Sequence, residues 1–175
     1  MITKLKQPTH FAGIMAASLV VILSGALLAQ ANRDSKEVEQ TLTDMLIPLA
    51  QKDLDRWAEY YVQDDSFSTV ILRGVYLVGF QNYKRYLRKW LETASMEQHT
   101  FSNIEVHLLG EVAWATVRDN CVIKYIDGNP DRVIRGIGTF ILVKRDGRWF
   151  INHYHVTDPN DNSASVFVQG NGIVQ

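Results

Sequence analysis

Alternating apolar and polar residues dominate the chain between residues 99 and 157, and this pattern predicts β-strands. The clearest part is Gly138–Thr157, GTFILVKRDGRWFINHYHVT, in which two β-branched and aromatic segments flank Asp146-Gly147. Glycine accepts the positive φ that a tight turn requires, so the dipeptide predicts a β-hairpin. Since side chains alternate along a strand, one face of the second strand is expected to carry Trp149, Ile151, His153 and His155.

The same periodicity predicts a set of four consecutive strands, at His99–Leu109, Glu111–Tyr125, Arg132–Arg145 and Trp149–Val156. Turn-forming residues at Gly110, Asp127–Pro130 and Asp146-Gly147 leave only short connections between them. Consecutive strands with such short links form an antiparallel meander. An earlier β-branched run, Ser66–Leu72, predicts one further strand.

The part of the chain before residue 99 has mostly helical periodicity, over Ser35–Gln51, Leu54–Val62 and Phe80–Thr93. Pro48 is expected to kink the first helix, because proline lacks an N–H donor and clashes with the preceding turn. Asp53 is placed to cap the second helix. Helices followed by a long-stranded sheet predict an α+β fold, a half-barrel in which a strongly curved antiparallel sheet packs on the N-terminal helices. The concave interior of such a sheet is a usual place for a small-molecule site.

Residues 1–31 have the pattern of a secretory signal peptide. Lys4 and Lys6 precede the uncharged apolar run Phe11–Leu28, and Ala29-Gln30-Ala31 supplies a small-x-small cleavage site. An uncleaved membrane anchor is the alternative. In either case the remainder is expected outside the cytoplasm, as a periplasmic, secreted or membrane-anchored protein. We therefore expect one domain at residues 32–159 and a C-terminal tail at residues 160–175.

Composition excludes some functions. The 18 Lys and Arg residues nearly balance the 19 Asp and Glu residues and form no basic run, so nucleic acid is not an expected partner. The single cysteine, Cys121, cannot form an internal disulfide and is expected to be a small buried residue. No nucleophile–base signature, phosphate loop or zinc pattern occurs, so the sequence predicts neither a cofactor nor a metal.

Asp119 is a candidate catalytic carboxylate. On the strand Glu111–Tyr125 it shares a face with an otherwise apolar set, so that face is expected to point inward. A buried carboxylate must be paired, hydrogen-bonded or held neutral, and each arrangement is typical of functional sites, with a structural ion pair as the alternative. If Arg135 of the next strand lies on the same face, the two either pair or form an acid–base or anion-binding couple.

His155 is the second candidate catalytic residue, because an imidazole can move a proton near neutral pH. A core histidine bonded to a backbone carbonyl is the alternative. His153 has the same parity and is a candidate ligand contact, but the two histidines lack a third ligand at a recognisable spacing for a metal. Aromatic residues are expected to wall the pocket or to pack in the core: Trp57, Tyr60, Tyr61, Trp90 and Tyr125.

Several motifs resemble the nuclear-transport-factor-like superfamily, in particular its SnoaL-like domains and the association domain of calcium/calmodulin-dependent kinase II. The motifs are Lys52–Tyr61, Val106–Gly110, and Asp146-Gly147-Arg148-Trp149 followed by His153-Tyr154-His155-Val156-Thr157. The resemblance spans roughly Glu37–Pro159. It implies a cone-shaped α+β half-barrel with an internal cavity, and homodimers or larger homo-oligomers built through sheet faces. Where the association domain has a basic residue after its second histidine this chain has Val156, so an arginine-lined pocket for carboxylates is not expected.

Two functions follow from these expectations. The first is an exported domain that binds a small, largely apolar ligand, with isomerisation, cyclisation or dehydration as its enzymatic form and Asp119 or His155 moving a proton. The second is a non-catalytic oligomerisation or protein-binding module. It would use the outer face of the sheet, where Val112 and Trp114 are expected to be exposed.

Overall fold

The computed structural model of the chain describes residues 28–71 and 74–158. The chain divides into two units, Met1–Asp34 and Ser35–Gln175, and residues 28–34 of the first unit are helical. Most of the predicted leader (residues 1–31) and the whole predicted tail (residues 160–175) lie outside the described residues. None of the helices in the described ranges is long and apolar enough to cross a membrane.

The second unit begins with the predicted helices. Residues 35–44 are helical, a turn interrupts them at Met45, and α2 (Leu46–Ala50) follows with Pro48 inside it. The interruption falls where the proline ring meets the turn before it. α3 (Leu54–Ala58) is capped by Asp53, as predicted.

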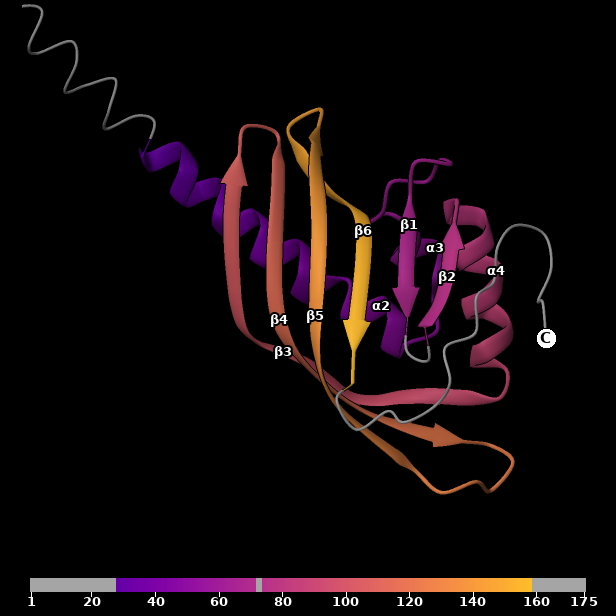
Figure 1. Ribbon diagram of the computed structural model, residues 1–175. Coiled ribbons are helices and arrows are strands. Elements are labelled where there is room, and N and C mark those ends of the chain that lie inside the picture. The colour runs from indigo at the N-terminus through magenta and orange to yellow at the C-terminus, as the bar shows by residue number, and fades with distance from the viewer. Residues whose placement is uncertain (1–27, 72–73, 159–175) are drawn as a thin grey trace, which may run out of the picture. The chain divides into compact units, whose positions relative to one another are not determined.

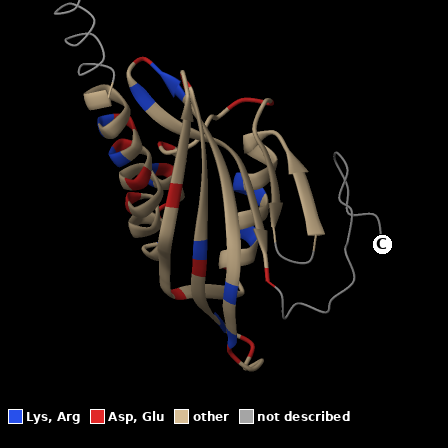
Figure 2. Ribbon diagram, turned by 60° about the vertical axis from the view of Figure 1, so that its left-hand side comes forward, with Lys and Arg blue, Asp and Glu red and all other residues tan. Residues whose placement is uncertain are grey.

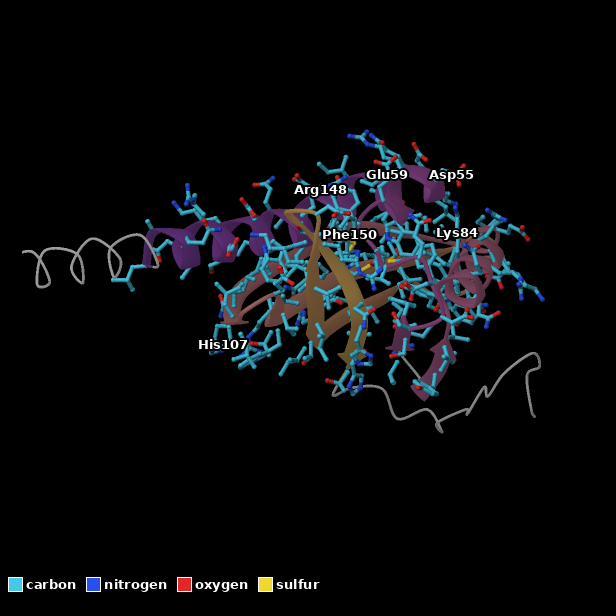
Figure 3. The ribbon with its side chains drawn as sticks, turned by 90° about the horizontal axis from the view of Figure 1, so that it is seen from above. Asp55, Glu59, Lys84, His107, Arg148 and Phe150 are labelled. Atoms are coloured by element: carbon cyan, nitrogen blue, oxygen red, sulfur yellow. The ribbon has the colours of Figure 1, made fainter. Side chains whose placement is uncertain are left out.

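α4 (Phe80–Leu91) buries one face, with Phe80, Tyr83, Leu87 and Leu91 in the core. Its other face is rich in Lys and Arg, as the sequence indicates. There the Lys84 ammonium group lies 2.7 Å from the carboxylate of Asp55 on α3, and Figure 3 shows both residues on the helical side of the domain. This contact joins α3 to α4 at the surface.

Six strands form one sheet in the order β2-β1-β6-β5-β4-β3. The strands are β1 (Ser68–Ile71), β2 (Val75–Val78), β3 (Ala94–Leu109), β4 (Val112–Tyr125), β5 (Arg132–Arg145) and β6 (Arg148–Thr157). β3 to β6 pair as the predicted antiparallel meander. Figure 1 shows the sheet bending strongly, with the helical residues 35–44 across one side of it. The α+β half-barrel predicted from the sequence is confirmed.

Two features of the sheet differ from the prediction. β1 pairs in parallel with β6, so the sheet is mixed and not wholly antiparallel. β2 (Val75–Val78) occupies a short segment for which the sequence analysis predicted no strand. The end of the predicted strand Ser66–Leu72 lies outside the described residues.

The main hydrophobic core lies between the helices and the inner face of the sheet, and a second, smaller cluster contains Ala94, Cys121, Ile123 and Ile134. On β4 the predicted parity is confirmed, with a buried set of Ala113, Ala115, Val117, Asp119, Cys121 and Ile123. Five aromatic rings from α3, α4 and the segment between them contact one another with centroids 4.3 to 6.2 Å apart: Trp57, Tyr61, Phe67, Phe80 and Tyr83. Figure 2 shows long uncharged stretches along the strands, and Asp119 is the one charged residue among the buried residues of the described ranges.

Candidate active site

A pocket of about 440 Å³ lies against the inner face of the sheet, with walls from α2, α4 and strands β1 and β3 to β6. Much of the lining is apolar, with residues such as Leu49, Met96 and Ile134. Its polar residues include Tyr61, Tyr83, Tyr86, His99, Asp119 and Tyr154. An apolar wall with a few polar groups is typical of small-molecule sites.

Asp119 is the buried charge of this pocket, at 3% exposure. One carboxylate oxygen lies 2.9 Å from Nε2 of His99, and the other accepts a hydrogen bond of 3.0 Å from the hydroxyl of Tyr154. An ionised carboxylate only accepts hydrogen bonds, so Nε2 of His99 is the donor of this pair when Asp119 is ionised. Hydrogen bonds to a charged group are stronger than neutral ones, and two of them stabilise a carboxylate in an apolar surrounding.

A β-bulge in β3 directs His99 toward Asp119. The register of β3 against β4 shifts between Glu97 and Thr100, and Gln98 has a φ of 50°. The extra residue reverses the alternation of side chains, so His99 faces the pocket although the regular pattern would turn it outward. The imidazole is only 9% exposed, and its Nδ1 atom has no hydrogen-bond partner among the described residues.

A second bulge, in β6, decides which side chains of the hairpin enter the pocket. The register of β5 against β6 shifts at Asn152. Before the bulge Ile151 is buried, and after it Tyr154 and Val156 line the pocket. The expectation that His155 faces the pocket is therefore wrong, because the bulge turns its side chain to the exposed outer face.

His153 lies on the same outer face and does not line the pocket, contrary to expectation. Its Nδ1 atom is 2.9 Å from the hydroxyl oxygen of Ser68, its neighbour across the parallel β1–β6 pairing. Partial burial lowers the pKa of this imidazole, and the nearby charge of His155 lowers it further. His153 thus ties β6 to β1.

Arg135 also points away from the pocket, so the proposed couple with Asp119 does not form. Directly opposite residues of an antiparallel pair share a face. Arg135 is opposite Asn120, whereas Asp119 is opposite Gly136, and Arg135 is exposed. The strand register therefore puts the two charges on opposite faces of the sheet.

A glycine on the inner face of β5 lets Tyr154 reach Asp119 across that strand. A Cβ atom at Gly138 would lie 3.1 Å from Val117 and 3.6 Å from the ring of Tyr154. The phenol ring also stacks on Phe140 of β5, with centroids 4.6 Å apart. Gly138 thus leaves the space in which a tyrosine of β6 hydrogen-bonds a carboxylate of β4.

Three phenol groups and the thiol of the pocket have raised pKa values and stay protonated at neutral pH. Burial raises the pKa of Tyr61, Tyr83 and Tyr154 above the usual value, and the charge of Asp119 adds to the shift at Tyr83 and Tyr154. Burial and then Asp119 raise the pKa of the Cys121 thiol to about 12. These groups can donate hydrogen bonds at neutral pH, but the thiol is a poor nucleophile.

Some of the aromatic residues that were predicted to wall the pocket line it, and others do not. Tyr61, Trp90 and Tyr125 line it, and a backbone bridge from Tyr61 to Ile151 fixes the first of them against β6. Trp57 is fully buried in the aromatic cluster and does not line the pocket. That the lining residues contact a ligand remains a prediction.

Sequence reasoning missed His99, Tyr83 and Tyr154. The local signals were two polar residues at the bulge positions, Gln98 just before the predicted strand His99–Leu109 and Asn152 inside the predicted strand Trp149–Val156. Tyr83 was assigned to a helix face but not to the pocket. Within residues 28–71 and 74–158, no group of three or more His, Cys, Asp or Glu residues is arranged to hold a metal ion.

Comparison with known proteins identifies relatives of this fold. The family model of the SnoaL-like domain matches residues 38–159. No curated protein matches the chain. Among solved structures, a proposed scytalone dehydratase from Novosphingobium aromaticivorans aligns with a TM-score of 0.68 and 18% identity, covering 83% of this chain and 99% of that one.

Two further structures have the same fold. A proposed dehydratase of the NTF2-like family from Streptomyces avermitilis has a TM-score of 0.64 and 15% identity, over 73% of this chain and 97% of that one. A proposed calcium/calmodulin-dependent protein kinase II association domain from Xanthomonas campestris has a TM-score of 0.59 and 19% identity, over 71% and 87%. The predicted resemblance to the nuclear-transport-factor-like superfamily is therefore confirmed.

Proposed function

Because this chain belongs to the SnoaL-like domain family, we propose that it binds a small, largely apolar ligand in the pocket beside Asp119. The observation that carries this proposal is the buried carboxylate held by His99 and Tyr154 inside an otherwise apolar lining. A buried charge is costly, and proteins retain it most often where it acts on a ligand. Two similar structures are described as dehydratases, which supports the same class of chemistry.

In its enzymatic form, the site transfers a proton. Asp119 removes a proton from a carbon next to a ligand carbonyl, and the protonated hydroxyl of Tyr83 donates a hydrogen bond to the enolate oxygen that forms. In an isomerisation the proton returns to another carbon. In a dehydration the neighbouring C–O bond breaks, and the departing hydroxide takes the proton and leaves as water. His99 and Tyr154 hold the carboxylate in place throughout.

A matched pair of variants on β5 tests ligand binding. Ile134 lines the pocket at 2% exposure, whereas Ile137 lies on the outer face at 49% exposure. We expect native mass spectrometry of protein purified from its own cells to show a retained small molecule. Ile134→Phe should abolish this retained mass and Ile137→Phe should not. Equal retention by both variants, or none in the wild-type protein, would contradict the proposal.

The proposal includes export from the cytoplasm. Its support is the sequence of residues 1–31, with Lys4 and Lys6 before an apolar run and a small-x-small site at Ala29–Ala31. Mass spectrometry of the N-terminal peptide, after cell fractionation, should give Asn32 as the first residue for a cleaved leader. An intact N-terminus in the membrane fraction would indicate the anchor, and an intact protein in the cytosol would exclude both.

A second candidate function is homo-oligomerisation through the outer face of the sheet. That face exposes a set of large apolar residues: Val78, Val112, Trp114, Val133, Ile137 and Ile141. Trp114 lies opposite His107 in register and stacks on it with centroids 5.0 Å apart, and Figure 3 shows His107 on the side away from the helical residues 35–44. An apolar patch of this kind on a soluble domain is typical of an interface.

Sedimentation velocity distinguishes this function from the first. We expect Trp114→Glu to lower the mass of any oligomer to that of the monomer, because it puts a charge into the patch. Ile47→Glu is the matched control, since Ile47 is 51% exposed on α2. A wild-type protein that is monomeric at high concentration would exclude oligomerisation and leave the ligand-binding proposal intact.

A further inference from the structure

The charges around the pocket are unevenly distributed. Asp119 and Asp127 are its acidic lining residues, and Arg132 is the one Lys or Arg among the described residues that line it. The guanidinium of Arg132 lies 3.3 Å from the carboxylate of Asp158, which is itself only 3% exposed. The cation is thus already matched by an acid, and the net charge facing a ligand is negative.

No described Lys or Arg forms an ion pair with Asp119, whose two oxygens are held by His99 and Tyr154. His99 and Tyr154 hold the carboxylate by hydrogen bonds, and the Nδ1 atom of the imidazole has no partner among the described residues. In this part of the chain no fixed cation offsets the carboxylate.

Tyr154 donates its one O–H to Asp119, so the hydroxyl of Tyr83, whose pKa burial raises, is a neutral donor that a ligand can use here. A hydroxyl or carbonyl group of a ligand can hydrogen-bond at this end, because the carboxylate accepts and the Tyr83 phenol donates. A ligand carboxylate in the same position would meet a like charge in a surrounding of low dielectric, where repulsion is strong.

We infer that the pocket selects uncharged apolar molecules that carry a carbonyl or hydroxyl group and excludes carboxylates of the same shape, with Asp119 as the selecting residue. This inference rests on the proposed ligand-binding function. It identifies the chemical class of the ligand by charge, which the family membership does not.

The inference is tested by changing the charge of the ligand and the charge of residue 119, separately and together. The probes are 2-naphthamide and 2-naphthoate, which have nearly the same shape and differ in charge, and Asp119→Asn makes the matching change in the protein. Binding at pH 7 is followed by calorimetry and by the fluorescence of Trp90 in the pocket wall. The wild-type protein should bind the amide at least about tenfold more tightly than the carboxylate, which corresponds to about 1.4 kcal/mol. Asp119→Asn should reduce this ratio to near one.

The control is Asp131→Asn, because Asp131 is exposed and does not line the pocket, so this variant should leave the ratio unchanged. Equal binding of both probes to the wild-type protein would overturn charge selection and leave the pocket proposal standing. An unchanged ratio in a cooperatively folding Asp119→Asn protein would overturn the role of Asp119. Failure of both probes to bind wild-type protein would overturn the ligand-binding proposal itself. The wild-type ratio remains informative even if the variant does not fold.

Discussion

At the scale of single residues, the central feature is a carboxylate that the fold has removed from water. Asp119 is compensated by hydrogen bonds from His99 and Tyr154 and not by an arginine. Deleting one donor leaves the carboxylate with an unfilled acceptor site, which costs more than the net value of the hydrogen bond. The site should therefore be visible in stability measurements even without a known ligand.

We expect Tyr154→Phe to lower the free energy of unfolding by about 1–3 kcal/mol, the typical cost of losing a hydrogen bond to a buried charged group. Urea denaturation followed by tryptophan fluorescence measures this difference. Tyr125→Phe is the matched control, because Tyr125 lines the same pocket, whereas the described hydrogen bonds to Asp119 come from His99 and Tyr154. Equal stability of Tyr154→Phe and wild type would show that the Tyr154–Asp119 hydrogen bond is not formed in solution.

At the scale of elements, two bulges and one glycine position assemble the site. The bulge at Gln98 brings His99 inward, and the bulge at Asn152 brings Tyr154 inward. β5 lies between β4 and β6 in the sheet, and Gly138 on β5 leaves the gap across which Tyr154 of β6 reaches Asp119 on β4. A bulge reverses the alternation of a strand for the residues that follow it, and in β3 a further register shift between Ser102 and Glu105 reverses it again.

A larger side chain at Gly138 should close this gap. We expect Gly138→Val to destabilise the domain by about 1–3 kcal/mol, because the added atoms crowd Val117 and Tyr154 in a packed core. It should also shift the NMR signals of Tyr154 and His99. Ile137→Val, one residue away on the exposed face, should change neither stability nor these signals. A Gly138→Val protein as stable as wild type would show that the inner face of β5 is not tightly packed.

At the scale of the molecule, the buried phenol and thiol groups should make the folded state less stable as the pH becomes alkaline. Tyr61, Tyr83, Tyr154 and Cys121 all have a pKa above the usual value in the folded state, chiefly because burial disfavours the charged form. The unfolded chain releases these protons at ordinary values, 9.0 for Cys and 10.0 for Tyr. Above those values the unfolded state binds fewer protons than the folded state, so stability falls as pH rises.

We therefore expect a free energy of unfolding that is insensitive to these groups below about pH 9 and declines steadily above it. Urea denaturation at successive pH values gives the slope. Tyr83→Phe removes one of the contributing groups and should give a shallower decline than wild type. An identical slope in the two proteins would mean that Tyr83 ionises in the folded state as easily as in the unfolded one.

Local sequence patterns determined the α+β class, the bounds of β5 and, to within one residue, those of β4. They also determined the Asp53 cap, the break near Pro48 and the inward side of Asp119. These follow from periodicity, turn residues and capping, which act between residues close in the chain.

Tertiary structure decided which residues line the pocket. Whether His155 or Tyr154 points inward depends on one bulge, and a bulge is set by how two strands pair, which no single strand encodes. Arg135 was misplaced for the related reason that its face depends on register against β4. The sequence therefore identified the carboxylate, and the packing of distant strands chose its partners, His99 and Tyr154.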